Sequence, residues 1–444
     1  MTVQLGNMTS DEGFTIFGGF VDNKVGHSVQ VVGDVNGDTI DDVLVGSLGA
    51  AYLIYGKDSA TRLDFDVTNM DPADGFEIVA SEGTGYFGMY VAAAGDVNFD
   101  GLADLVVSDI FDTNINTYSA GNVYVVFGAE SRASGPFDVS TMSASEGVLI
   151  LGATPDGRVG SAVSAAGDFD NDNYDDLLIG DPTGNGNNGV YYLLSGEALT
   201  NAANGVINLA SLTATDGWTF SGSSFNGRMG QSLSGGGNVN GDSIPDFLVG
   251  APYFSLDFST LESYPLIGGA SLVTAIRTSS SVVDLNTEGT TAGLGVMGGI
   301  VEDYVGLAVS IVSDINGDGL DDMVLGSAYS SAANGTLSGR VYVIYGSSQI
   351  PSNSAAFFGY LDTTISPSDG FMIIGPAASA NAGRSVSSAG DFNGDGINDL
   401  LIGADGYNSN TGAAYVIFGE SGTTRGMLDP VSYTHLTLPT NREV

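Results

Sequence analysis

Short apolar runs separated by turn residues are the main pattern of this chain. The runs are four to seven residues long, are rich in Val, Ile, Tyr and Phe, and are bounded by Gly, Asn and Asp. This alternation is typical of β-strands joined by tight turns, and no amphipathic stretch of useful helical length interrupts it. The pattern therefore predicts an all-β protein.

The apolar pieces recur as a set. A small-residue piece precedes an acidic loop, a second piece follows the loop directly, and an aromatic-aliphatic piece comes next, as in 27–32, 42–46 and 51–56. A fourth piece begins with Gly and an aromatic residue, as in 75–78, 217–222 and 370–375. Four antiparallel strands per unit, repeated radially, form a β-propeller. We predict six blade units in this chain, near residues 26–80, 88–152, 160–222, 230–298, 306–375 and 384–419.

The positions of the fourth strand along the chain also predict how the ring of blades closes. One copy, at 13–18, precedes the first unit, and none follows the sixth. We therefore expect this N-terminal strand to complete the last blade within a single propeller domain, 1–430, and a native ring of seven blades stays open as an alternative. Residues 431–444 carry none of the repeat's features and resemble the translated end of a common sequencing adaptor, so we treat them as a non-native tail.

A nine-residue acidic loop lies between the first and second strands of every unit. Loops 1 to 6 span 34–42, 96–104, 168–176, 238–246, 314–322 and 391–399. Side-chain oxygens recur at positions 1, 3, 5 and 9, and position 7 offers its backbone carbonyl. Such a loop suits a hard cation with six to eight oxygen ligands, and calcium fits best. The predicted ligands, for up to six Ca²⁺ ions, are Asp34, Asn36, Asp38, Ile40, Asp42, Asp96, Asn98, Asp100, Leu102, Asp104, Asp168, Asp170, Asp172, Tyr174, Asp176, Asn238, Asn240, Asp242, Ile244, Asp246, Asp314, Asn316, Asp318, Leu320, Asp322, Asp391, Asn393, Asp395, Ile397 and Asp399.

The six loops differ in charge. Loop 3 has Asp at all four side-chain positions, whereas loop 4 has only two carboxylates and is predicted to bind most weakly or to stand empty. The alternative is that these Asx-Gly clusters are only turn formers. An EF-hand is excluded because it needs a bidentate Glu at position 12, and a dockerin loop fails at the same place. Position 12 is aliphatic in every loop: Val45, Val107, Ile179, Val249, Leu325 and Ile402.

Composition limits the partners. The chain has 11 Lys and Arg against 52 Asp and Glu, a formal net charge of -41. Such a surface repels nucleic acids and anionic membranes, so we expect neither nucleic-acid binding nor membrane insertion. Weak calcium loops fill where calcium is about millimolar, which favours an extracellular or cell-surface location. No signal peptide is visible in the first twenty residues, and the chain has no cysteine.

Candidates for catalysis are few. His27 is the one histidine outside the tail, and it lies at a strand start, where packing or turn formation is the more ordinary role. Carboxylates are abundant, but many are already assigned to the loops and no separate acidic pair stands out. We therefore predict no enzymatic activity for this chain.

The chain resembles the FG-GAP repeat family, which includes the N-terminal propeller of integrin α subunits and propellers of bacterial surface proteins. Phe87-Gly88 and 250–252 carry the motifs literally, and 159–160 and 403–405 carry relaxed forms. The resemblance covers roughly residues 12 to 420. It implies a calcium-bearing propeller that is used for adhesion or ligand binding and is part of a larger polypeptide. An accessory propeller of a larger extracellular enzyme, such as a phospholipase D, and a structural spacer are the alternatives.

The resemblance also implies that ligands bind on the face opposite the calcium loops. Long second-to-third connections, at 108–121 and 252–268, open on that face and carry aromatic and acidic residues. The predicted contacts to an extracellular protein or glycan ligand are Tyr253, Phe254, Phe258 and Tyr264. The alternative is that these aromatic residues pack onto their own blade.

Overall fold

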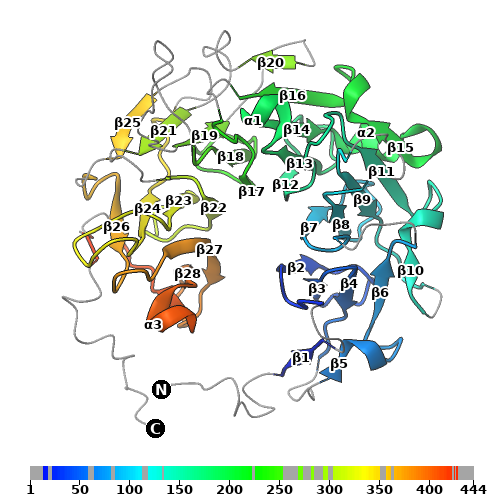
Figure 1. Ribbon diagram of the computed structural model, residues 1–444, viewed down its shortest axis with the longest axis horizontal. Helices are drawn as coiled ribbons and strands as arrows, with labels where there is room; N and C mark the ends of the chain where they lie inside the picture. Colours follow the sequence, from blue (N-terminus) through cyan, green and yellow to red (C-terminus); the bar gives the residue numbers. More distant parts are fainter. Residues whose placement is uncertain are drawn as a thin grey trace.

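The computed structural model is an all-β propeller with short helices. It describes residues 14–18, 23–58, 65–81, 86–112, 119–132, 135–222, 226–253, 269–273, 282–284, 294–298, 304–350, 357–361, 365–422, 425 and 427–428. Six of the seven described sheets are blades that stand around a common centre, and the seventh is a two-stranded pair (Figure 1). Five of the blades have four or five strands, and the sixth has three. The predicted fold class is confirmed.

The strands follow the predicted units. Blades 1 to 3 contain β2 (Val29–Gly33), β3 (Asp42–Gly46), β4 (Ala50–Ile54) and β6 (Gly75–Val79); β7 (Val91–Gly95), β8 (Asp104–Asp109), β9 (Asn122–Val126) and β11 (Gly147–Leu151); and β12 (Ala162–Gly167), β13 (Asp176–Asp181), β14 (Val190–Leu194) and β16 (Gly217–Ser221). Blades 4 to 6 contain β17 (Ser232–Gly237), β18 (Asp246–Gly250), β19 (Gly269–Val273) and β21 (Leu294–Gly298); β22 (Ala308–Val312), β23 (Asp322–Ser327), β24 (Arg340–Ile344) and β26 (Gly370–Ile374); and β27 (Ala382–Gly390), β28 (Asp399–Ala404) and β29 (Ala413–Ile417).

Each of blades 1 to 4 gains a fifth strand from the next unit. These strands pair in parallel with the outer strand of the preceding blade, unlike the antiparallel strands within each unit. They are β10 (Phe137–Asp138), β15 (Val206–Asn208), β20 (Val282–Asp284) and β25 (Phe357–Leu361). On blade 5, Leu428 forms the corresponding parallel bridge to Ile373. This fifth strand is absent from the four-stranded units predicted from the sequence.

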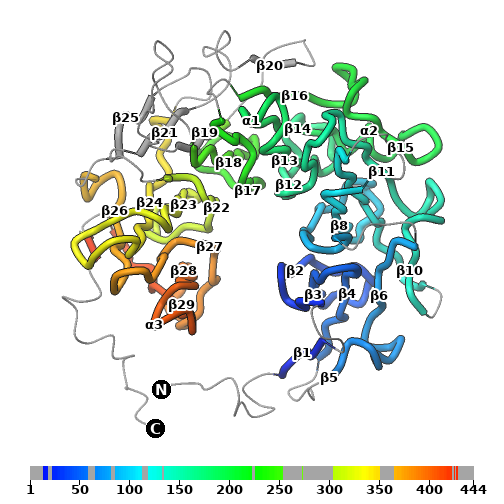
Figure 2. Tube along the Cα trace, in the orientation of Figure 1, coloured from blue at the N-terminus to red at the C-terminus, as the bar shows by residue number. Residues whose placement is uncertain are grey.

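The predicted closure by the N-terminal strand is not what the structure shows. β1 (Ile16–Phe17) pairs in parallel with β5 (Phe65–Asp66), and β29 has only β28 as a hydrogen-bonded neighbour among the described strands. Toward β5, β1 has the place that β6 has toward β10, which is that of an outer strand of the preceding blade. It forms no hydrogen-bonded pair with β29 in the described part of the chain, so it does not complete blade 6. The arc of described blades is open between blade 6 and blade 1 (Figures 1 and 2). The suspected tail, 431–444, lies outside the described residues.

Helices are short and lie in connections. They are α1 (Gly184–Asn187), α2 (Gly196–Thr200) and α3 (Tyr407–Asn410), with 3-10 turns at Val67–Asn69, Val139–Thr141, Ala203–Gly205 and Leu209–Ser211. Within the described part of the chain, no helix has the length and hydrophobicity needed to cross a bilayer.

The core is made by the faces of neighbouring blades. Second strands alternate between the two faces of their sheet, so that one side chain meets the preceding blade and the next meets the following blade. Leu177 and Leu178 on β13 are both fully buried and belong to two different apolar clusters, one shared with blade 2 and the other with blade 4. Each blade therefore needs a neighbour on both sides to remove its apolar surface from water.

Candidate metal loops

All six predicted loops lie in the described residues, and the side chains at positions 1, 3 and 5 fold each loop around itself. In loop 1, Asp34 accepts hydrogen bonds from the backbone N–H groups of Gly37, Asp38 and Thr39, at N–O distances of 2.7, 3.1 and 2.7 Å. The Asp38 carboxylate accepts from Ile40 N at 2.9 Å. The same position-5 to position-7 bond recurs in the other five loops. The side-chain oxygens are thereby turned toward the inside of one tight turn.

The aspartate at position 9 joins the loop to its sheet. Asp104 accepts a hydrogen bond from Val97 N at 2.9 Å and another from Gly128 N, at the end of the third strand, at 2.7 Å. In all six loops the backbone N–H of position 2 donates to the position-9 carboxylate. In loops 1, 2, 3, 5 and 6 the same carboxylate also accepts from the N–H of a glycine that follows the third strand. The glycine is required because a Cβ on Gly128 would lie 2.7 Å from the Ala103 carbonyl oxygen.

These position-9 carboxylates are buried among like charges. Asp104 and Asp176 are fully buried, and burial is the main reason that the pKa of each is raised to about 8. Burial likewise raises the pKa of Asp42 to about 6 and that of Asp246 and Asp322 to about 7. A buried carboxylate without a nearby cation resists ionisation. The donor set therefore fits a bound cation, which would favour the charged form.

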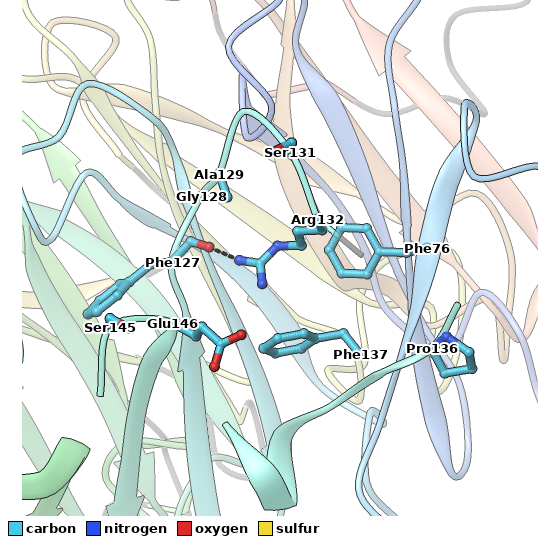
Figure 3. Close-up of a pocket in the computed structure, with 10 residues that line it drawn as sticks. All are labelled: Phe76, Phe127, Gly128, Ala129, Ser131, Arg132, Pro136, Phe137, Ser145 and Glu146. Carbon is cyan, nitrogen blue, oxygen red and sulfur yellow. Dashed lines mark hydrogen bonds between the residues drawn. The ribbon is translucent and has the colours of Figure 1, made fainter. Parts of the chain in front are cut away.

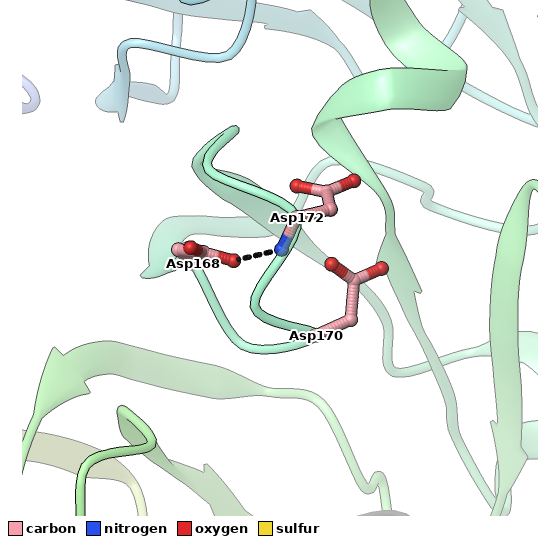
Figure 4. Close-up of side chains that lie close together, drawn as sticks. All are labelled: Asp168, Asp170 and Asp172. Carbon is pink, nitrogen blue, oxygen red and sulfur yellow. Dashed lines mark hydrogen bonds between the residues drawn. The ribbon is translucent and has the colours of Figure 1, made fainter.

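Loop 3 is chemically distinct from the other loops. Its Asp168, Asp170 and Asp172 each place a carboxylate oxygen within 4.8 Å of the others (Figure 4). In the other five loops position 3 is Asn, and its Nδ2 donates to the position-5 carboxylate at 2.9 to 3.2 Å. An ion in those loops would replace that hydrogen bond, with the amide oxygen turned inward. Loop 3 needs no such rearrangement.

Loop 4 has the poorest donor set. Asn238 donates its Nδ2 to the Asp242 carbonyl at 2.5 Å and accepts from Gly241 N at 2.8 Å. Its side chain is thus engaged by the loop backbone, and two carboxylates remain, at Asp242 and Asp246. That loop 4 is the weakest of the predicted sites stays a prediction.

The opposite rim carries one of the four predicted ligand contacts. Tyr253 packs between Arg228, whose guanidinium lies 4.7 Å from the ring centroid, and Tyr304, whose ring centroid is 5.4 Å away. Tyr304 continues to Tyr329 at 6.0 Å. Phe254, Phe258 and Tyr264 lie outside the described residues. Tyr253 therefore packs beside its own and the next blade, and its role as a ligand contact stays a prediction.

His27 has a packing contact. Its ring meets Tyr90 edge-on at 5.8 Å, across the junction between blades 1 and 2. Burial and then Lys24 lower the pKa of His27, which favours the neutral imidazole. The contact supports the packing role predicted for this residue.

A pocket of about 220 Å³ lies at the outer edge of the junction between blades 1 and 2 (Figure 3). The Arg132 guanidinium stands over Phe76 and Phe137, with centroid distances of 5.4 and 4.5 Å, and it donates to the Phe127 carbonyl. Arg425 repeats this arrangement over Phe371 of blade 5. We interpret the pocket as part of a cation–π contact between blades.

Comparisons with known proteins identify the family of these repeats. Residues 229–263, 305–344 and 382–417 match the FG-GAP repeat family model. The chain therefore carries FG-GAP repeats in these segments, and its described blades form a β-propeller.

Several curated relatives share part of this sequence. The chain is 28% identical to Integrin alpha-PS2 of Drosophila melanogaster over 60% of its own length and 18% of the relative. It is 28% identical to Integrin alpha-V of Gallus gallus, over 54% of the chain and 21% of the relative. It is also 32% identical to Phosphatidylinositol-glycan-specific phospholipase D of Rattus norvegicus, over 29% of the chain and 16% of the relative. The chain therefore spans about a fifth of these relatives or less.

Proposed function

We propose that this chain is a calcium-binding propeller of a secreted or cell-surface protein and that it mediates adhesion or ligand binding. The observation that carries the proposal is the sixfold recurrence of a nine-residue loop with oxygen donors at positions 1, 3, 5, 7 and 9 and a buried carboxylate at position 9. Oxygen-only donors of this kind suit Ca²⁺. The similarity to integrin α subunits supports an extracellular binding role.

Calcium has a structural role in this proposal. An ion in each loop would neutralise carboxylates that are held close together and would fix the turn between the first and second strands. Ligands that bind only the folded state stabilise it by mass action. Chain 1–430 should therefore melt at a clearly higher temperature in millimolar calcium than in chelator. An unchanged melting temperature, together with no heat of calcium binding, would overturn the calcium proposal.

The partner site is proposed on the rim opposite the loops, around Tyr253. Arg228 and Tyr304, which flank Tyr253, have φ angles of 52° and 53°. The same conformation occurs at the equivalent residues Lys24 and Asn381, with φ angles of 51° and 54°, so it belongs to the repeat. What supports a partner site here is the cluster of Tyr253 with Arg228 and Tyr304. The proposed partner is an extracellular protein or glycan.

Binding to an array of glycans and matrix proteins, with calcium and then with chelator, tests this role. We expect capture of a defined ligand that is weakened by the joint substitution of Tyr253, Phe254 and Tyr264. Capture that is unaffected by this substitution would place the partner site elsewhere on the propeller.

An accessory propeller of a larger extracellular enzyme is the second candidate function. The observation that favours it is the match to the phosphatidylinositol-glycan-specific phospholipase D. Calcium-dependent stability without capture of any ligand on the array would favour this candidate, or a spacer role, over adhesion. The catalytic neighbour would then be sought in the full reading frame.

A further inference from the structure

The junction between blades 2 and 3 brings two of the loops into direct contact. Asp175, at position 8 of loop 3, donates its N–H to the Asp96 carbonyl at 3.2 Å. In return, Asp96 N donates to Asp175 Oδ2 at 2.8 Å. Asp96 is the position-1 residue of loop 2, so a single residue of loop 3 holds the peptide groups on both sides of the first ligand of loop 2.

This contact is close and has little freedom. A Cβ on Gly95 would lie 2.3 Å from Asp175 Oδ2, so only glycine, here with a φ of 83°, allows the carboxylate to approach. Further contacts reach the same loop, because Thr200 Oγ1 donates to the Val97 carbonyl at 3.0 Å and the Phe99 ring lies 5.8 Å from Tyr174. Blade 3 thus contacts loop 2 at positions 1, 2 and 4.

The junction between blades 4 and 5 repeats the arrangement. Asp321 N donates to the Asn238 carbonyl at 3.1 Å, and Asn238 N donates to Asp321 Oδ2 at 2.7 Å. Ser347 N, at the end of the third strand, donates to the Val239 carbonyl at 2.8 Å. Asp321 of loop 5 therefore holds the first residue of loop 4 in the same way that Asp175 of loop 3 holds the first residue of loop 2.

The other junctions lack the side-chain half of this contact. Position 8 is Ala103 in loop 2, Pro245 in loop 4 and Asn398 in loop 6. Ala103 N and Asn398 N still donate to the position-1 carbonyl of the preceding loop, at 2.9 and 3.3 Å. Pro245 has no N–H to donate. The junction between loops 3 and 4 is therefore a built-in comparison for the other two.

We propose that cation binding in loop 3 raises the affinity of loop 2 through Asp175, and that loop 5 acts on loop 4 through Asp321 in the same way. This inference rests on the proposed binding of cations by the loops. An ion in loop 3 would fix Tyr174 and Asp176, which flank Asp175 in the chain. A fixed Asp175 would hold Asp96 in place, so that an ion entering loop 2 would have fewer side chains and peptide groups to order. By linkage, an ion in loop 2 would raise the affinity of loop 3 by the same factor. The Asp175 carboxylate, bonded to Asp96 N and adjacent in the chain to Asp176, would also offset part of the repulsion between ions in the two loops.

Hydrogen exchange of the whole chain during a calcium titration tests the proposal, because peptides from each loop report its filling separately. In Asp172→Ala, which disables loop 3, the calcium midpoint of loop 2 should rise about fivefold or more. In Asp175→Ala, loop 3 should still fill, and adding Asp172→Ala should then leave the loop 2 midpoint unchanged. Asp175→Asn keeps an oxygen acceptor and should restore most of the coupling.

Two controls keep the outcome clear. Asp41→Ala changes the same position of loop 1, whose side chain faces no preceding described blade, and should leave the midpoints of loops 2 and 3 unchanged. Asp242→Ala in loop 4 should leave loop 3 unchanged, because Pro245 lacks the linking N–H. If Asp175→Ala fails to fold, the loop 2 midpoint in Asp172→Ala still decides whether loop 3 acts on loop 2, and Asp318→Ala in loop 5 repeats the test at loop 4 if that loop fills.

The possible results separate this inference from the proposed function. Protection of the loops at the same calcium midpoint in Asp172→Ala and in the unchanged protein would overturn the coupling while leaving calcium binding in place. The absence of calcium-dependent protection in all six loops would instead overturn the proposed cation binding itself.

Discussion

Equivalent residues have different surroundings inside the arc of blades and at its open ends. On the second strand, Leu178 of blade 3 is fully buried against blade 4, whereas Leu401 of blade 6 occupies the same register and is 38% exposed. At the other end, Val29 and Val31 on the inner strand of blade 1 are 59% and 58% exposed. The repeat unit is the same in each case. The comparison shows that burial in this fold belongs to the junction between blades and not to the blade alone.

The largest effect is expected at the buried aspartates of position 9. Asp104→Ala would leave the N–H groups of Val97 and Gly128 without acceptors inside the junction, at a cost of about 3–5 kcal/mol in the free energy of unfolding. Asp399→Ala in blade 6 should cost about half as much, because Phe392 beside it is 67% exposed and water can reach its N–H. Urea unfolding in chelator measures both without a contribution from calcium. Equal losses would show that the end of the arc is as closed as its interior.

A smaller effect tests the apolar faces directly. Leu178→Ala should cost about 2–5 kcal/mol because it leaves a cavity between blades 3 and 4. Leu401→Ala should cost about 1 kcal/mol or less, since its side chain is partly in water already. The same urea titration compares the two variants. A large loss in Leu401→Ala would mean that another surface covers this face in solution.

The pH dependence of the calcium-free protein should also differ between the two regions. Burial raises the pKa of Asp104 to about 8 but that of Asp42, in the end blade, only to about 6. Because each folded value exceeds the ordinary 3.8, the folded state binds more protons than the unfolded state between these limits, and stability falls as pH rises through that window.

Single amide variants separate these two contributions. Asp104→Asn should flatten the fall in melting temperature between about pH 6 and 8, and Asp42→Asn should leave that part unchanged. Melting curves in chelator across this range provide the measurement. If both variants flattened the same part of the pH profile, the predicted difference in pKa between Asp104 and Asp42 would be wrong.

The smallest expected effect concerns a pair of substitutions that tests how the ring of blades closes. Inside the arc, Ile311 N donates to Ser234 Oγ at 2.9 Å, across the junction between blades 4 and 5. Direct closure of six blades would bring Ser387 and Val31 into the equivalent positions. We expect one more blade between them, because the arc of described blades is open between blade 6 and blade 1 and β1 does not pair with β29 (Figure 1).

A cysteine pair can distinguish the two ring sizes, since the chain has no cysteine of its own. Ser234→Cys with Ile311→Cys should cross-link under mild oxidation, and Ser387→Cys with Val31→Cys should not. Mass spectrometry after proteolysis detects each link. Efficient linkage of the second pair would establish direct six-bladed closure.

Local features of this protein were predictable from the sequence, and features that depend on a neighbour were not. The loops and the strands beside them follow from spacing within nine residues and from period-two patterns. The fifth strands were missed because a segment such as Phe137–Asp138 is too short to show a period and pairs with residues nearly sixty positions earlier. Asp175 was missed because position 8 gains its role only from the preceding blade. Whether each loop holds calcium stays a prediction.

Because of the parallel fifth strands, each repeat of the sequence extends into the sheet of the preceding blade. The chain segment that completes one sheet is encoded in the next repeat, so a gene duplication or deletion of one unit alters the hydrogen bonding of two sheets. Stability in repeat proteins is approximately a sum of unit terms and nearest-neighbour terms. In this propeller the hydrogen bonds of each fifth strand join two repeats, so they contribute to the free energy of interaction between neighbouring units and not to that of a single unit. New ring sizes should therefore arise more readily by copying several adjacent units than by copying one.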